Sequence, residues 1–488
     1  YGITNAAQQV EIPLRTEGID PSETTEASLR PDSVCIQGHI TNYSRRNMPR
    51  LIRSSYHSEQ LDFTDGSVYP ICCRIDSSGH FSLSFLADHA IWNFLELVEV
   101  NRILPFFVHP GDTLQIDIDN YGQWNEHVRY TSLHGHNTCS GLMHLGRDLI
   151  EQYLPGTTSR RNYDTYLKDT EAFYRGKSRF FDYIAWKYKL TPWEAQLLGD
   201  CLKMNKAINR LDFLNEQYGK LFTAWYKLPE DHRPDYAIVQ FCKPEELEFL
   251  KEVNWSNPEL LFVFNWPAMK ELYYQHSPLC RFVHEAETNP SGAKDLWDSS
   301  WQEQFKQRLL EDLPGMAPSL VEDFILSKAP WAEDVISTTK EMTYISNAPT
   351  TRQFINTLLP ECKSEFIQLL FIDKQKGLEQ DSWYSKYHNF IEDFSDNAQI
   401  CFVLVVESDD ETAKMEQRLR LNFPHTPVRF VNTEMFLRLC EDLRISTFPE
   451  DRTIDNSGQI LRKHLHSYDE RMFRDGLKQL QKLKLQKE

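Results

Sequence analysis

The stretch ISTFPEDRTIDNSGQIL, residues 445–461, decides the fold of the C-terminal third. It has the pattern of a β-hairpin, because two extended runs flank the turn signal NSG at 456–458. Upstream lie two continuous apolar runs of strand length, FIQLLFID at 366–373 and ICFVLVV at 400–406, separated by an amphipathic helical pattern at 382–394. The sequence therefore predicts two neighbouring parallel strands joined by a right-handed helical crossover.

The same alternation continues around the hairpin. Helical patterns cover 411–423, 435–443 and 470–483, and an extended run covers 427–432. The predicted order of elements from residue 366 onward is β-α-β-α-β-α-β-β-α. Such an order indicates an α/β domain.

Two regions of different pattern precede this domain. From Val34 to Asp119, short β-branched or aromatic runs alternate with turn signals, which favours an antiparallel β-sandwich. From Ser140 to Pro330, apolar residues recur at a spacing of three and four, which predicts helices, with helix starts at Thr191-Pro192 and at Lys243-Pro244. The fold class is multidomain α+β. The predicted parts are an N-terminal arm (1–33), a β-sandwich domain (34–125), a helical middle domain (126–337) and a C-terminal α/β domain (338–488).

Composition and charge limit the function classes. Hydrophobic residues make up 41% of the chain and aromatic residues 12%, which is enough for packed cores. The formal net charge of −18 repels phosphate backbones and anionic lipid, so we expect no nucleic-acid partner. No apolar run reaches the ~20 residues of a spanning helix, so we expect no transmembrane span. The chain begins at Tyr1 rather than Met, which favours an upstream segment that was either cleaved or left out of this sequence.

The C-terminal third resembles the TlpA/ResA-like thioredoxin family. Members of that family carry a strand, a WCxxC helix start, a long helix and a second strand, then the segments I-x-x-x-P and ID-x-x-G-x-I. The matching residues are Ile445, Phe448 and Pro449 for the first segment, and Ile454, Asp455, Gly458 and Ile460 for the second. The resemblance implies a thioredoxin-like domain and a cis proline at Pro449, with an ordinary loop proline as the alternative.

The N-terminal part is similar to the β-rich domain that often precedes such modules in envelope proteins of Gram-negative gut anaerobes. The matches are Gly38 and Ile40, Gly79 and Phe81, and the PGD motif at 110–112. The resemblance thus covers the two ends of the chain. It implies a location in the periplasm or cell envelope after removal of an N-terminal signal.

The chemistry of the thioredoxin family requires two thiols, one of them a thiolate whose pKa is lowered at a helix N-terminus. The resemblance places this pair near Gly377 and Gln380, and neither residue is a thiol. A shifted alignment does not restore it, because no Cys lies between Cys362 and Cys401. We therefore predict no catalytic residue. The predicted vestigial redox site consists of Gly377, Leu378, Glu379, Gln380, Phe448 and Pro449.

The ten cysteines are scattered and contain no CxxC, which favours structural thiols. Cys362 is the alternative redox thiol, since it precedes a strand at a position where partial exposure is expected. Adjacent Cys72 and Cys73 should point to opposite faces of a strand, one toward the core and one toward the surface.

One group of residues could suit zinc or copper, because it combines imidazoles with a thiolate. It consists of His134, His136, Cys139 and His144. The segment contains Gly135 and Gly141 and follows directly on the β region, so it has the pattern of a domain junction with solvated or locally hydrogen-bonded histidines. We predict no metal site and no cofactor.

These patterns together predict a catalytically silent thioredoxin-like protein of the envelope with a binding or scaffolding role. Its partner would be an unidentified protein or small molecule of that compartment. Two alternatives stay open. One is a thiol-disulfide oxidoreductase that acts through a non-standard cysteine, and the other is a small-molecule or glycan binder that uses aromatic residues of the middle domain. Fold by itself does not supply function.

Overall fold

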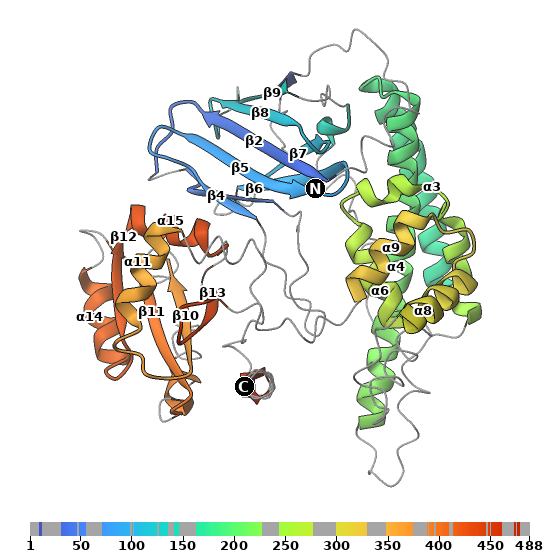
Figure 1. Cartoon of the computed structure of the whole chain (residues 1–488). Coiled ribbons are helices and arrows are strands. Elements are labelled where there is room, and N and C mark those ends of the chain that lie inside the picture. Colours follow the sequence, from blue (N-terminus) through green and yellow to red (C-terminus); the bar gives the residue numbers. More distant parts are fainter. Residues whose placement is uncertain are drawn as a thin grey trace. The chain divides into compact units, whose positions relative to one another are not determined.

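The computed structural model shows a mixed α+β protein, as the sequence predicts, and its described residues form three sheets (Figure 1). The structure describes residues 9–11, 31–45, 48–54, 71–97, 100, 102–123, 126–134, 141–145, 163–226, 244–276, 299–328, 348–373, 388, 390–394, 397–408, 413–445, 448, 450–460, 473–474 and 476–478.

The chain divides into two compact units. The first contains residues 1–37, 84–95 and 103–329, and the second contains residues 38–83, 96–102 and 330–488. The second unit therefore combines a part of the N-terminal β region with the C-terminal α/β region, although the sequence patterns of these two parts differ.

The β region contains short strands in two of the sheets. The strands are β1 (Gln9–Glu11), β2 (Asp32–Ile40), β3 (Leu51–Ser54), β4 (Cys72–Arg74), β5 (His80–Ala87), β6 (Ile91–Leu97), β7 (Arg102–Val108), β8 (Thr113–Asp119) and β9 (His127–His134). The strand orders are β1-β9-β8-β2-β5 and β4-β3-β6-β7. The pairs β3–β4 and β8–β9 are antiparallel and β1–β9 is parallel. The sequence patterns do not predict β3 or β9, and β9 lies past residue 125, where the sequence places the end of the β domain.

Helices follow from residue 141. They are η2 (Gly141–His144), α3 (Tyr163–Lys187), α4 (Pro192–Tyr226), η4 (Pro244–Glu252), η5 (Pro258–Phe262), α6 (Trp266–His276), α8 (Ser299–Asp312) and α9 (Pro318–Lys328), where η marks 3-10 helix. Helix α4 begins as predicted, because Thr191 and Glu194 form a reciprocal cap. The Glu194 N–H donates to Thr191 Oγ1 at 3.2 Å, and the Thr191 N–H donates to Glu194 Oε2 at 2.7 Å.

The C-terminal region forms the third sheet, with strand order β12-β11-β10-β13 (Figure 1). Its elements are α11 (Pro349–Leu358), β10 (Phe366–Ile372), β11 (Ile400–Ser408), α14 (Ala413–Asn422), β12 (Val428–Asn432), α15 (Thr433–Asp442) and β13 (Glu450–Asp455). Strand β10 pairs with β11 in parallel and with β13 antiparallel, and β11 pairs with β12 in parallel. The predicted parallel pairing of 366–373 with 400–406 is confirmed.

Both faces of the third sheet are covered, because consecutive side chains of β10 point to opposite sides. Ile367, Leu369 and Phe371 pack with α11 and α15 in one core, which also includes Leu51 of β3. Phe366, Leu370 and Ile372 pack in a second core on the other face, together with the helical residues 390–394, with α14 and with Phe473. Double coverage explains why β10 is a continuous apolar run.

The longest helices of the described chain, α3 and α4, are too polar to cross a bilayer, and none of the other described helices meets the length and hydropathy of a membrane span.

Candidate functional site

The predicted vestigial redox site falls mostly outside the described residues. Gly377, Leu378, Glu379, Gln380 and Pro449 are not described, so their arrangement stays a prediction. Phe448 is described and is buried in the core that faces α15, with its ring centroid 5.4 Å from that of Phe436. The described part of the chain nearest to this predicted site is the edge of the sheet at which β10 ends.

Two buried carboxylates mark this edge. Asp373 directly follows β10 and Glu407 lies near the end of β11, and the register that pairs Ile372 with Val406 brings them to the same end of two parallel strands. Both side chains are almost fully excluded from solvent. Because a buried carboxylate is costly without a partner, this edge requires a counter-charge.

Arg50 supplies that charge. Its Nη1 donates to both carboxylate oxygens of Glu407, at 2.7 and 2.8 Å, and its Nη2 donates to Asp373. The side chain of Arg50 is only 2% exposed. A planar guanidinium can bridge two carboxylates in this way, whereas an ammonium cannot present the same fork. The carboxyl ends of β10 and β11 are thus joined by one residue from the N-terminal part of the chain.

The β3–β4 hairpin holds Arg50 in place. Leu51 pairs with Arg74 across the hairpin, and the Ile75 N–H extends the ladder by donating to the Arg50 carbonyl at 2.8 Å. The side chain of Leu51, next along the chain, is buried in the core beneath α15. Backbone pairing and the burial of a neighbouring side chain therefore fix the guanidinium from two directions.

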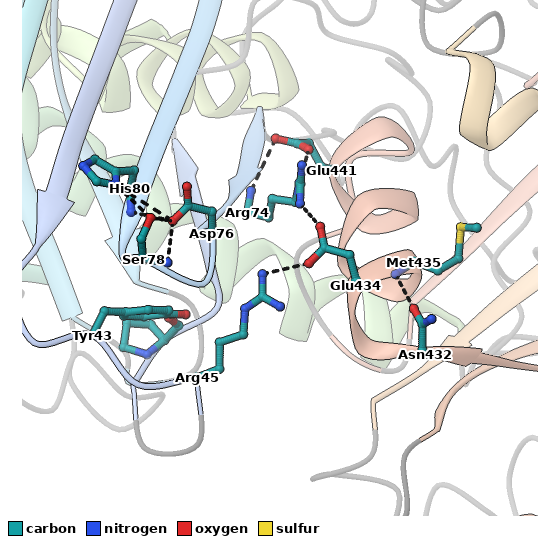
Figure 2. A network of polar contacts seen from close by, with 11 residues as sticks. Tyr43, Arg45, Arg74, Asp76, Ser78, His80, Asn432, Glu434, Met435 and Glu441 are labelled. Carbon is teal, nitrogen blue, oxygen red and sulfur yellow. Dashed lines mark hydrogen bonds and ion pairs between the residues drawn. The ribbon is translucent and has the colours of Figure 1, made fainter.

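A second group of charges lies at the same end of this hairpin, where Arg74 meets α15 (Figure 2). Arg74 donates through Nε to Glu441 Oε2 at 3.1 Å and through Nη1 to Glu434, and Arg45 Nη2 donates to Glu434 Oε2 at 2.9 Å. Partial burial raises the pKa of Glu434, but the hydrogen bond from Arg45 and the charges of Arg74 and Arg45 outweigh it and hold that pKa below the ordinary value of a glutamate. For Glu441 burial prevails, and its pKa is raised despite Arg74.

Local sequence explains how these groups are presented. Asn432 caps α15, since its Oδ1 accepts from the Met435 N–H at 2.9 Å, and this places Glu434 in the first turn, where the helix dipole favours an anion. In the turn after β4, Asp76 Oδ1 accepts from the N–H groups of Ser78 and His80 at 2.8 and 3.0 Å (Figure 2). Gly79 in this turn has φ +91°, which favours glycine.

The thiols near this contact are poor nucleophiles. Cys72 Sγ donates to the Cys440 carbonyl at 3.4 Å, and burial raises the pKa of Cys72 to about 12. Burial also raises the pKa of Cys440 well above its usual value. The expectation of one core and one surface thiol at 72 and 73 is wrong, because both Cys72 and Cys73 are buried. The strand is covered on both faces, so alternation along it exposes neither side chain.

Cys362 also differs from its prediction. It is buried rather than partly exposed, and it forms a disulfide with Cys401 of β11, with the two Cα atoms 5.7 Å apart. The bond spans a sequence separation of 39, which explains why the sequence pattern does not reveal it. The disulfide links the segment before β10 to the amino end of β11, opposite the end that holds Arg50.

The candidate metal ligands are only partly described. His134 is exposed at the end of β9, whereas His136 and Cys139 lie outside the described residues. His144 stacks on Tyr188 with ring centroids 4.3 Å apart, and burial, followed by the charge of Lys187, lowers its pKa. Within the described ranges no three His, Cys, Asp or Glu side chains are grouped so that they could hold a metal ion.

Sequence reasoning missed Arg50, Asp373 and Glu407. A signal existed for the carboxylates, because each one closes an apolar run that is long enough to be a buried strand. A charge at such a position needs a buried partner. The identity of that partner carried no local signal, since Arg50 is 323 residues away from Asp373 and 357 residues away from Glu407.

No protein-family model, curated protein or solved structure matches this chain.

Proposed function

We propose that this chain is a catalytically silent, thioredoxin-like protein of the cell envelope that binds or scaffolds a partner there. The proposed parts are an N-terminal antiparallel β-sandwich, a helical middle domain and a C-terminal thioredoxin-like domain. Support for the last comes from β10 and β11 as parallel neighbours, with the antiparallel β13 on the other side of β10. Ile454 and Ile460 form an antiparallel backbone pair, which is the beginning of the β-hairpin that the family signature requires.

The observation that carries the proposal is the bridge from Arg50 to Asp373 and Glu407. In the family that this chain resembles, the redox pair follows the first of these strands, so its thiols work at the carboxyl edge of the sheet. Here that edge carries two carboxylates held by a guanidinium, which stays charged at physiological pH. Such an arrangement stabilises a packed contact and offers no thiolate to a disulfide.

The disulfide supports the proposed compartment. Disulfides persist in oxidising environments such as the bacterial periplasm and are rare in the cytosol. The Cys362–Cys401 bond therefore agrees with an exported protein.

A specific observation also favours a second candidate, a thiol-disulfide oxidoreductase that acts through a non-standard cysteine. Cys362 and Cys401 are a bonded pair, and Cys401 is partly exposed. If a substrate thiolate reached Cys401, exchange would release the Cys362 thiol and form a mixed disulfide. The burial of Cys362 weighs against fast exchange.

An insulin-reduction assay with dithiothreitol distinguishes the two candidates. We expect the full chain to give the rate of dithiothreitol alone, while an active thioredoxin assayed beside it accelerates precipitation. The matched variants are Cys362→Ser and Cys401→Ser, with Cys201→Ser, a buried cysteine of the helical region, as the control. Robust activity that either of the first two variants abolishes and the control retains would overturn the proposal in favour of the oxidoreductase.

A further inference from the structure

Helix α3 carries a row of exposed aromatic side chains in its C-terminal half. Trp186 is 75% exposed, Tyr183 50% and Phe180 40%. They recur every three residues, so they lie along one side of the helix. The rings of Tyr183 and Trp186 are neighbours, with centroids 5.8 Å apart.

This row is additional to the face that α3 buries. Tyr174, Phe181 and Ile184 are buried on the other side of the helix, and Lys177 is buried beside them, with its Nζ 5.6 Å from the ring centroid of Phe173. An amphipathic helix needs only one apolar face to pack in its own domain. The exposed aromatic row is therefore a second apolar surface, which packing of the helix does not explain.

Cations surround the row. Arg175, Arg179, Lys187 and Lys189 are all exposed, and Asp182 is the one acidic residue of the sequence segment 175–190. The chain as a whole carries a net charge of −18, so this segment has the opposite sign to the protein. Arg175, Arg179 and Tyr183 follow one another at a spacing of four, and the charged and aromatic side chains therefore share one face. We call the surface formed by Arg175, Arg179, Phe180, Tyr183, Trp186, Lys187 and Lys189 the basic aromatic face.

The end of the helix fixes the last part of this face. The Leu190 N–H donates to the Ala185 carbonyl at 2.9 Å, and Lys189 adopts φ +50°, which together form a Schellman-type C-cap. Lys187 Nζ lies 4.9 Å from the ring centroid of Tyr188. The two lysines are thus held next to Trp186 by the backbone and by a ring contact.

We infer that the basic aromatic face docks on the surface of a membrane that contains anionic phospholipid. Its positive charge is complementary to anionic head groups, and Trp and Tyr favour the level of the head groups, where one end of the ring is apolar and the other is wet. Interfacial helices bury Trp, Phe or Leu at the head-group boundary while their Lys and Arg contact anionic lipid. The long stems of Lys and Arg allow charges that lie beside the aromatic row to reach the head groups. The negative charge elsewhere on the protein does not prevent docking, because salt screens exposed charges beyond about 8 Å at physiological ionic strength.

Co-sedimentation of the full chain with phosphatidylcholine vesicles, prepared with and without phosphatidylglycerol, tests the inference. We expect binding to vesicles that contain phosphatidylglycerol and a loss of this binding as salt is raised. Arg175→Glu with Arg179→Glu should weaken it by at least roughly fivefold per residue. Trp186→Ala with Tyr183→Ala should also weaken it and should remove a blue shift of tryptophan emission on vesicle addition.

The matched controls change similar side chains at other exposed positions. Leu421→Ala removes an apolar side chain that is 72% exposed, and Lys251→Glu reverses a cation that is 70% exposed. Circular dichroism and thermal unfolding should be unchanged in all variants, because the altered side chains are exposed. Equal binding by the face variants and the controls would overturn the inference. Equal binding to vesicles without phosphatidylglycerol would also overturn the inference. Binding of the face to a single-stranded oligonucleotide and to no vesicle would overturn it as well.

Discussion

The two charge groups of the second unit show how the same residue types serve different purposes. The inner group joins Arg50 to Asp373 and Glu407 with both partners buried, whereas the outer group joins Arg74 to Glu434, whose side chain is half exposed. Buried charges cannot return to water when a partner is removed, so each of them depends on the others. Exposed charges are rehydrated when a partner is removed, so pairs of exposed charges contribute little to the free energy of unfolding. The inner group therefore holds the β3–β4 hairpin to the C-terminal sheet, while the outer group only surrounds that contact.

Removal of the inner guanidinium should give the largest effect. Arg50→Ala leaves two buried carboxylates without their bridge and should lower the free energy of unfolding by about 3–5 kcal/mol. Urea unfolding measures the loss, and amide exchange on β10 and β11 localises it. Arg53→Ala, in the adjoining strand β3, is the matched control, since the Arg53 side chain is 28% exposed where it pairs with Glu96. Equal losses in the two variants would contradict the distinction between buried and exposed charges.

Removal of the disulfide should have the next largest effect. Cys362→Ser with Cys401→Ser frees a loop of 39 residues and should cost about 3–4 kcal/mol in the chain-entropy description. Urea unfolding of the variant and of the wild type, with and without reductant, measures this. Reductant should lower the stability of the wild type alone. If reductant also destabilised the variant to the same extent, another bond would be responsible.

The outer group should contribute little to the free energy of unfolding, and this contribution should depend on the salt concentration. Glu434→Gln should change the free energy of unfolding by about 0–1 kcal/mol, less at high ionic strength. Thermal unfolding at two salt concentrations is a sufficient measurement. A loss as large as that of Arg50→Ala would show that the outer pairs share the role of the inner group.

The two outer carboxylates should respond to acid in opposite directions. The pKa of Glu434 is lowered in the folded protein, so its contribution to stability is present above the unfolded value and is lost as pH falls through the folded one. The pKa of Glu441 is raised, so folding favours its protonated form and acid removes a penalty. Carboxyl NMR titration should place the pKa of Glu434 below the ordinary value of a glutamate and the pKa of Glu441 above it. The reverse order would contradict the roles of Arg45 and of burial.

The smallest effect is expected in the alkylation of the thiols that lie between the two charge groups. Cys72 and Cys440 are buried with raised pKa values, so they should react with iodoacetamide only as fast as the second unit unfolds. Mass spectrometry of labelled peptides at mildly alkaline pH tests this. Rapid labelling of Cys72 in the native protein would show that the contact between β4 and α15 opens.

Much of the framework of this protein follows from its sequence. The apolar runs at 366–373 and 400–406 predict two buried parallel strands, and these strands pair as expected. The hairpin turn after β13 also forms at the predicted place, with Gly458 at φ +81°. The capped start of α4 is a third example. Each of these features depends on residues close together in the chain, so a local pattern contains the information.

Only the tertiary structure decided what meets the C-terminal sheet. The short strand β3 has too few residues for a clear pattern, and the partners of Arg50 lie more than three hundred residues along the chain. The burial of both Cys72 and Cys73 and the pairing of Cys362 with Cys401 depend in the same way on distant segments. The net charge of the chain likewise does not reveal the basic aromatic face, because a sum over all residues does not show where positive side chains lie close together. Sequence determines local conformation through short-range sterics and periodicity, whereas counter-ions, disulfide partners and exposed faces are fixed only when remote segments pack.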